Sequence, residues 1–242
     1  GGLRGVLLHG AYQAVIDSYV SGWFFPYTEC QAVAGWNGPG PFKIVNNYLE
    51  AAGENILFGG ATPTIVGIIP ADIEIRRNHV FVPLSWLSDF PAKFFKNLFE
   101  LKTGSRIWVE GNIFENMTAG GQSGWALVLT PRSDGGWQQV SDVTIRSNTI
   151  KHAGGGAAVS GTDSLVPGVA SRIAFINNLW VDILVSLGIG GATGDLFALN
   201  NGVTDVTISH NTSTQEGSLA KSDGIGYVTA STAITWQNNI HP

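Results

Sequence analysis

The stretch Ile107-Trp-Val109-Glu-Gly-Asn112 decides the fold, because the chain repeats its pattern from end to end. In each copy, two apolar residues separated by one residue are followed by two more residues and then an asparagine. A weaker first copy has serine in the asparagine place, and the eight positions are Ser18, Asn47, Asn78, Asn112, Asn148, Asn178, Asn211 and Asn239. Neighbouring copies lie 28 to 36 residues apart. Such a variable period is typical of a solenoid whose coils carry loops of different length.

Within each copy, the alternation of apolar residues with others predicts a short strand with one buried face. A single short strand cannot bury that face alone, so each strand is expected to stack in parallel and in register on the next coil. The asparagine follows the strand at a sharp turn, where this residue type tolerates left-handed αL geometry. At the parallel-strand spacing of roughly 4.8 Å, successive amides are expected to form a ladder of hydrogen bonds. This structural role accounts for the asparagines without a functional one.

Two further strands are predicted in each coil. The segments 97–104 (NLFELKTG) and 195–202 (DLFALNNG) match almost residue for residue and lie just before a template strand. A third short strand follows the asparagine, as in Ile113-Phe-Glu115. The sequence therefore predicts an all-β fold, a right-handed parallel β-helix (solenoid) of about eight coils with three short strands per coil. We expect residues 1–242 to form one such domain and to belong to a longer chain.

Composition excludes several classes of function. Only 13% of the residues are charged and the net charge is −5, which is too small to direct association with a particular partner. No basic patch with interleaved aromatic residues is present, so we expect no binding of nucleic acid. No apolar run is long enough to cross a membrane. Cys30 is the single cysteine, so the chain forms no internal disulfide.

The order of the strands, the asparagine turn and the coil length resemble the pectate-lyase-like superfamily of right-handed parallel β-helices. More narrowly, the segments 46–60, 72–78 and 97–102 are similar to a group of bacterial secreted β-helix repeat proteins without assigned chemistry. The superfamily includes polysaccharide lyases, galacturonan hydrolases, phage tailspikes and adhesins, so the fold does not settle the function. The resemblance implies an extracellular or cell-surface location and a polysaccharide partner. Self-assembly and flanking domains are the other partners to consider.

In the enzymes of that superfamily, the catalytic groove runs along the first strand of each coil. Carried onto this chain, the resemblance implies that Phe99 and Leu101 point inward while Glu100 and Lys102 point out into the groove. The candidate catalytic residues are therefore Glu100, Lys102, Arg132 and Asp134, and the candidate substrate-binding residues are Trp86, Phe90, Lys96 and Trp137. The competing interpretation makes Glu100 and Lys102 part of a solvated strand face without a role in chemistry.

Two mechanisms would use such residues. A lyase needs carboxylates to hold Ca²⁺ against a uronate and a lysine or arginine to take the proton next to the carboxyl group. A hydrolase needs two carboxylates at a defined separation. The chain lacks the Asn-Thr-Asp, Asp-Asp, Gly-His-Gly and Arg-Ile-Lys signatures of the galacturonan hydrolases, and it lacks the Arg-x-Pro-x-x-Arg motif of the pectate lyases. If the protein is an enzyme, a lyase using Ca²⁺ is favoured over a hydrolase. The alternative is a non-catalytic structural, adhesive or filament-forming solenoid.

Three other features of the sequence lead to expectations about single segments or residues. The aromatic residues of the insertion 83–95 form a stacking platform for sugars or fold back over the sheet, and both interpretations stay open. The outward residues Arg76, Glu110 and Arg146 of successive template strands are expected to form a row of salt bridges rather than a catalytic set. The histidines near the turns are too scattered along the template to predict a metal site.

Overall fold

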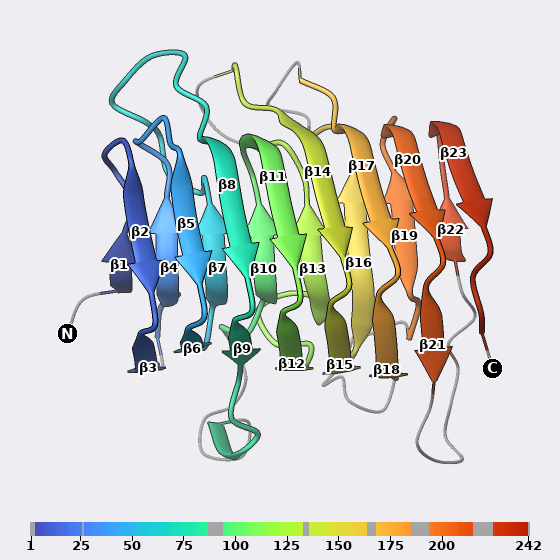
Figure 1. Cartoon of the computed structure of the whole chain (residues 1–242), viewed down its shortest axis with the longest axis horizontal. Coiled ribbons are helices and arrows are strands. Elements are labelled where there is room, and N and C mark those ends of the chain that lie inside the picture. The colour runs from blue at the N-terminus through green and yellow to red at the C-terminus, as the bar shows by residue number, and fades with distance from the viewer. Residues whose placement is uncertain are drawn as a thin grey trace.

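The computed structural model describes residues 3–25, 27–86, 94–132, 136–163, 168–184, 194–214 and 225–241. The chain winds into a parallel β-solenoid in which successive coils contribute strands to three sheets (Figure 1). All pairings between neighbouring coils are parallel, and strand β11 (Gly104–Glu110) pairs with the preceding and the following coil alike. The predicted fold class, an all-β solenoid with three strands per coil, is confirmed.

The three sheets are called A, B and C in the order in which the chain enters them. Sheet A contains β1 (Arg4–Leu7), β4 (Gln31–Gly35), β7 (Glu54–Phe58), β10 (Asn97–Leu101), β13 (Trp125–Leu129), β16 (Gly155–Ser160), β19 (Phe197–Asn200) and β22 (Ile225–Val228). Sheet B contains β2 (Gln13–Ile16), β5 (Phe42–Val45), β8 (Ala71–Arg76), β11, β14 (Val140–Arg146), β17 (Ser171–Ile176), β20 (Thr204–Ser209) and β23 (Thr232–Gln237). Sheet C contains β3 (Tyr19–Trp23), β6 (Tyr48–Ala51), β9 (His79–Phe81), β12 (Ile113–Met117), β15 (Thr149–Ala153), β18 (Leu179–Ile183) and β21 (Thr212–Thr214).

The number of coils differs slightly from the sequence expectation. In the described part of the chain, seven coils contribute a strand to all three sheets, and a further coil contributes β22 and β23 to sheets A and B. The template strands predicted from the asparagine pattern are the strands of sheet B, and the segment 97–104 supplies β10 of sheet A. No helix among the described residues is long and apolar enough to cross a membrane.

The interior is filled by rows of apolar side chains stacked along the solenoid. Ile73, Ile107 and Val143 lie in direct register on three neighbouring strands of sheet B, and all three are buried. This register is strongly specified, because a shift by one residue would turn every buried side chain of a strand toward solvent. Stacking thus gives each short strand the apolar partner that it lacks within its own coil.

The predicted asparagine ladder is confirmed. Asn112 donates from its backbone nitrogen and from Nδ2 to Oδ1 of Asn148, at 2.9 Å in both cases, and Asn148 makes the same two bonds to Asn178 at 3.0 Å. Nδ2 of each ladder asparagine also donates to a backbone carbonyl of the preceding coil, as from Asn112 to Ile75 at 2.9 Å. The ladder runs through Asn47, Asn78, Asn112, Asn148, Asn178, Asn211 and Asn239.

One detail of the turn prediction is wrong. The residue with left-handed geometry is the one before each ladder asparagine, as shown by Arg77 with φ of 53° and Ser147 with φ of 54°. The bend before the asparagine aims its side chain along the solenoid toward the next coil. The ladder position therefore requires the amide group for its hydrogen bonds and does not require a residue that tolerates positive φ.

Candidate functional site

A group of charged side chains lies around the neighbouring strands β7 and β10 in the interior of sheet A. We call Glu54, Lys96, Glu100 and Lys102 the sheet A cluster. Lys102 Nζ lies 3.5 Å from a carboxylate oxygen of Glu100 and 3.9 Å from one of Glu54. Lys96 Nζ lies 3.6 Å from the same oxygen of Glu54 and also pairs with Glu29. The structure thus brings together three of the residues that the sequence nominates, Lys96, Glu100 and Lys102.

The cluster is buried, which contradicts the expectation of a solvated strand face. Phe99 and Leu101 face the core, so strand alternation places Glu100 on the other side of β10, yet Glu100 is only 2% exposed and Lys102 only 7%. Lys102 lies against Gly59, and a Cβ added to Gly59 would lie only 2.8 Å from the Cβ of Lys102. A glycine is needed there for this close approach and for its φ of 98°.

Burial controls the electrostatics of the sheet A cluster. Removal from water raises the pKa of Glu100 to about 7, the nearby Lys102 ammonium opposes that rise, and the carboxylate of Glu54 adds to it. Burial alone would lower the pKa of Lys96, but the carboxylates of Glu54 and Glu29 outweigh it and raise that pKa. Gln31 further satisfies Glu54 by donating from Nε2 to Oε2 at 2.6 Å. The charges neutralise one another inside the protein.

A carboxyl group with a pKa near neutrality is suited to general acid–base chemistry, but a substrate must reach it. In this conformation Glu100 and Lys102 have almost no accessible surface. The catalytic role that the sequence suggests for these two residues stays a prediction, and it requires the cluster to open. The residues also do not fit Ca²⁺, because lysine ammonium groups occupy the space around the carboxylates where oxygen ligands would be needed.

A solvent-accessible hollow lies beside the cluster at the carboxyl ends of β13, β16 and β19. We call it the Arg132 hollow; its volume is about 430 Å³, and its lining residues are Thr130, Arg132, Ala158, Ser160, Thr162, Asp163, Asn200 and Asn201. Arg132 Nε donates to Asp163 Oδ2 at 2.5 Å, and Asn201 Nδ2 donates to Ser160 Oγ at 2.9 Å. The backbone nitrogen of Arg132 donates to the carbonyl of Lys102 at 2.9 Å, so the hollow adjoins the buried cluster.

Trp86 and Trp137, the described aromatic residues among the nominated candidates, do not line the Arg132 hollow. Trp137 is partly buried, and its Nε1 donates to the carbonyl of Ile68 at 3.2 Å. Trp86 packs on Phe24, with ring centroids 5.1 Å apart, and Phe95 is fully buried. For Trp86 and Phe95 the structure favours the interpretation in which the insertion folds back over the solenoid. Phe90 and Asp134 lie outside the described residues.

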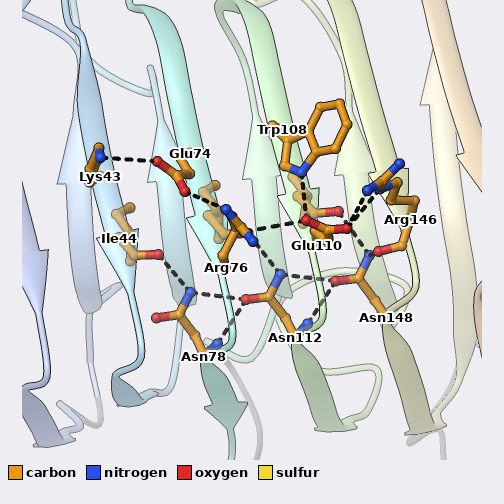
Figure 2. A network of polar contacts seen from close by, with 12 residues as sticks. Lys43, Ile44, Glu74, Arg76, Asn78, Trp108, Glu110, Asn112, Arg146 and Asn148 are labelled. Atoms are coloured by element: carbon orange, nitrogen blue, oxygen red, sulfur yellow. Dashed lines mark hydrogen bonds and ion pairs between the residues drawn. The ribbon is translucent and has the colours of Figure 1, made fainter.

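The expected salt-bridge row on sheet B is present (Figure 2). Lys43 lies 3.5 Å from Glu74, Arg76 bridges Glu74 and Glu110 at 2.9 and 3.3 Å, and Arg146 lies 2.6 Å from Glu110. Opposite charges on neighbouring strands attract across the parallel sheet, and together they form one row over the ladder of asparagines. This arrangement confirms the structural interpretation of these residues.

Sequence reasoning missed a second row of ion pairs on sheet B. Arg106 makes two hydrogen bonds to Asp72 at 2.7 and 2.9 Å, and Arg172 makes two to Asp142 at 2.6 and 2.8 Å. These residues hold the position just before the first apolar residue of each template strand. Aligning the repeats on that position would have found the alternation of acidic and basic residues. Trp108, an outward aromatic residue of β11, was also missed.

Within the described part of the chain, no group of three or more histidine, cysteine, aspartate and glutamate side chains is arranged to hold a metal ion. His79 lies 2.8 Å from Glu115, and Lys151 lies 3.0 Å from the other oxygen of that carboxylate. Both oxygens of the Glu115 carboxylate therefore have a partner within the protein.

Comparison of the sequence with models of known protein families gives no match, and comparison with curated proteins gives none either.

Proposed function

We propose that the protein is an extracellular solenoid that binds a polysaccharide along the outer side of sheet A without cleaving it. The observation that carries this proposal is the Arg132 hollow, which is open to solvent and lined by guanidinium, carboxylate, amide and hydroxyl groups. Its volume of about 430 Å³ falls within the range of small-ligand sites. Hydrogen-bonding groups of this kind suit the hydroxyl groups of sugars. They come from three successive coils, so an extended polysaccharide lying across the coils meets several of them.

Burial of the sheet A cluster supports binding over cleavage. A lyase needs an accessible base and carboxylates free to hold Ca²⁺. Here the candidate base, Lys102, is engaged by Glu54 and Glu100 away from solvent. A second candidate function is a structural solenoid that stacks end to end. The observation that favours it is that one coil stacks on the next in register and through the asparagine ladder, which is the contact that end-to-end assembly would repeat.

Calorimetric titration with polygalacturonate, alginate and galactan tests the proposal. Arg132→Ala removes one charge-assisted donor from the hollow and is expected to weaken binding about tenfold or more. The matched control is Arg172→Ala, which removes an exposed arginine from a similar pair with an aspartate on sheet B and should leave binding unchanged.

Three other outcomes would contradict the proposal. Equal loss in both variants would indicate nonspecific attraction to charged polymers. Unsaturated product, followed by absorbance with and without Ca²⁺, would show cleavage. Absence of binding to all three polymers, together with concentration-dependent association in sedimentation, would favour the structural solenoid.

A further inference from the structure

A second hollow lies on the outer face of sheet B, away from the Arg132 hollow. We call it the Trp108 hollow; its volume is about 290 Å³, and its lining residues are Asp72, Ile73, Glu74, Arg76, Arg106 and Trp108. Trp108 is 38% exposed although it lies in the middle of a regular strand. The residues in register with it along sheet B are Ala14, Lys43, Glu74, Thr144, Ala174, Thr207 and Thr235. An aromatic ring interrupts this row of polar and small residues at a single coil.

The indole ring of Trp108 is held in a fixed orientation. Its Nε1 donates to Glu110 at 3.0 Å, and the guanidinium carbon of Arg146 lies 4.4 Å from the ring centroid. Figure 2 shows the ring standing out from β11 between Glu74 and Arg146. Arg146 therefore covers the ring on the side of β14, while the side toward β8 borders the hollow. Because the ring is already positioned, binding of a ligand that stacks on it carries no entropic cost for ordering the side chain.

The charges around the hollow cancel. Asp72 and Glu74 contribute two carboxylates, and Arg106 and Arg76 contribute two guanidinium groups. Arg106 holds both oxygens of Asp72, at 2.7 and 2.9 Å, and Arg76 holds Glu74 at 2.9 Å. These pairs are fixed in place and retain hydrogen-bonding capacity toward a further ligand, since each carboxylate oxygen accepts more than one bond. A hollow with balanced charge favours a neutral polar ligand over a uronate or another ion.

We propose that the Trp108 hollow binds one neutral hexopyranose ring of an oligosaccharide. The C–H groups on one face of the sugar lie against the negatively charged face of the indole ring. The hydroxyl groups at the edge of the sugar reach the carboxylates of Asp72 and Glu74 and the guanidinium of Arg106. The volume accommodates a single ring, and the neighbouring sugars of a longer chain extend over the exposed face of sheet B. The site is independent of the Arg132 hollow, because it lies on a different sheet and shares no lining residue with that hollow.

Saturation-transfer NMR with methyl β-glucopyranoside, methyl β-galactopyranoside and cellotetraose tests this site in the whole chain. Sites that hold a single sugar are weak, so we expect a dissociation constant of about 1 mM for the best of these probes. Trp108→Thr is the informative variant, because Thr144 holds the equivalent place in the next coil and the strand tolerates threonine there. We expect it to lower the affinity about tenfold or more, and Asp72→Asn to lower it severalfold.

Arg172→Ala is the matched control: it removes an exposed arginine of sheet B that lines neither hollow, and it should leave binding of these neutral probes unchanged. Far-ultraviolet circular dichroism establishes that each variant is folded. Equal binding by Trp108→Thr and the wild type would overturn the assignment, as would the absence of saturation transfer from all three probes at about 20 mM, well above the expected dissociation constant. Stronger binding of galacturonate, or of a nucleoside, than of the neutral sugars would overturn the ligand class.

Discussion

The outer sides of sheets A and B carry the same kinds of charged residue in opposite surroundings. On sheet A, Glu100 and Lys102 are almost completely buried and neutralise each other away from solvent. On sheet B, the side chains of Glu74, Arg76 and Glu110 keep 20 to 36% of their surface accessible to water. Pairing of opposite charges is thus common to both sheets, and burial is the variable that differs between them.

This difference predicts unequal energetic roles. An exposed ion pair contributes from zero to about 1 kcal/mol, because water and salt screen the charges. Breaking a buried pair costs about 3–5 kcal/mol, since the remaining charge is left without a partner in a poorly solvated site. The buried cluster is therefore expected to determine stability, and the exposed row to adjust it slightly.

Replacement of Lys102 by methionine should give the largest effect. The substitution leaves Lys96 as the one ammonium group of the sheet A cluster beside the carboxylates of Glu54 and Glu100, and we expect the free energy of unfolding at pH 7 to fall by about 3–5 kcal/mol. Urea denaturation followed by circular dichroism measures it. The matched control is Lys43→Met in the exposed row, where the lysine side chain is 61% exposed and the expected change is below about 1 kcal/mol. Equal losses of stability in the two variants would contradict the difference that we infer between the buried cluster and the row on sheet B.

The two carboxylates Glu100 and Glu110 should respond to pH in opposite directions. Burial raises the pKa of Glu100 to about 7, from its usual 4.5, so the folded state holds a proton that the unfolded state releases. Its contribution to stability is full below pH 4.5 and is lost as the pH rises through 7. Hydrogen bonds from Trp108 and Arg146 lower the pKa of Glu110, so its contribution is present above its usual pKa and lost as the pH falls.

Urea denaturation from pH 4 to pH 8 measures how the free energy of unfolding changes with pH. Glu100→Gln should remove the loss of stability between about pH 4.5 and 7, since the amide does not titrate. Glu110→Gln should leave that loss in place. A wild-type stability that stays level through this range, or a pH dependence that survives in Glu100→Gln, would show that Glu100 is ionised throughout.

The sequence predicts what depends on position within the repeat and fails where neighbouring loops decide. The ladder through Asn112 and the pairing of Arg76 with Glu110 follow from residues that recur at fixed places in each coil. Strand alternation places Glu100 opposite the core, but it does not show that Glu100 is buried there with the charges of Lys102, Glu54 and Lys96 around it. That outcome depends on packing between segments that no local pattern relates.

Trp108 illustrates a different limit of the sequence pattern. Its outward position on the template strand is readable, and on a regular solenoid such a residue lies on a solvated face. The binding role that we propose for it depends on its neighbours across the sheet, because Arg146 covers the ring on one side and Asp72 and Glu74 line the hollow on the other. A pattern of single residues does not describe this combination. An alignment of the coils does describe it, because the residues at equivalent positions of neighbouring strands are then compared together.

Replacement of Glu110 by glutamine should give the smallest effect, and salt separates it from the buried cluster. The variant loses the ion pairs with Arg76 and Arg146, which we expect to lower the free energy of unfolding by less than about 1 kcal/mol in dilute buffer. At 1 M salt, where charges are screened beyond about 3 Å, the difference from the wild type should vanish. The deficit of Lys102→Met should persist under the same conditions, because ions do not enter the buried cluster. Persistence of the Glu110→Gln deficit at high salt would show that the exposed row acts through packing rather than charge.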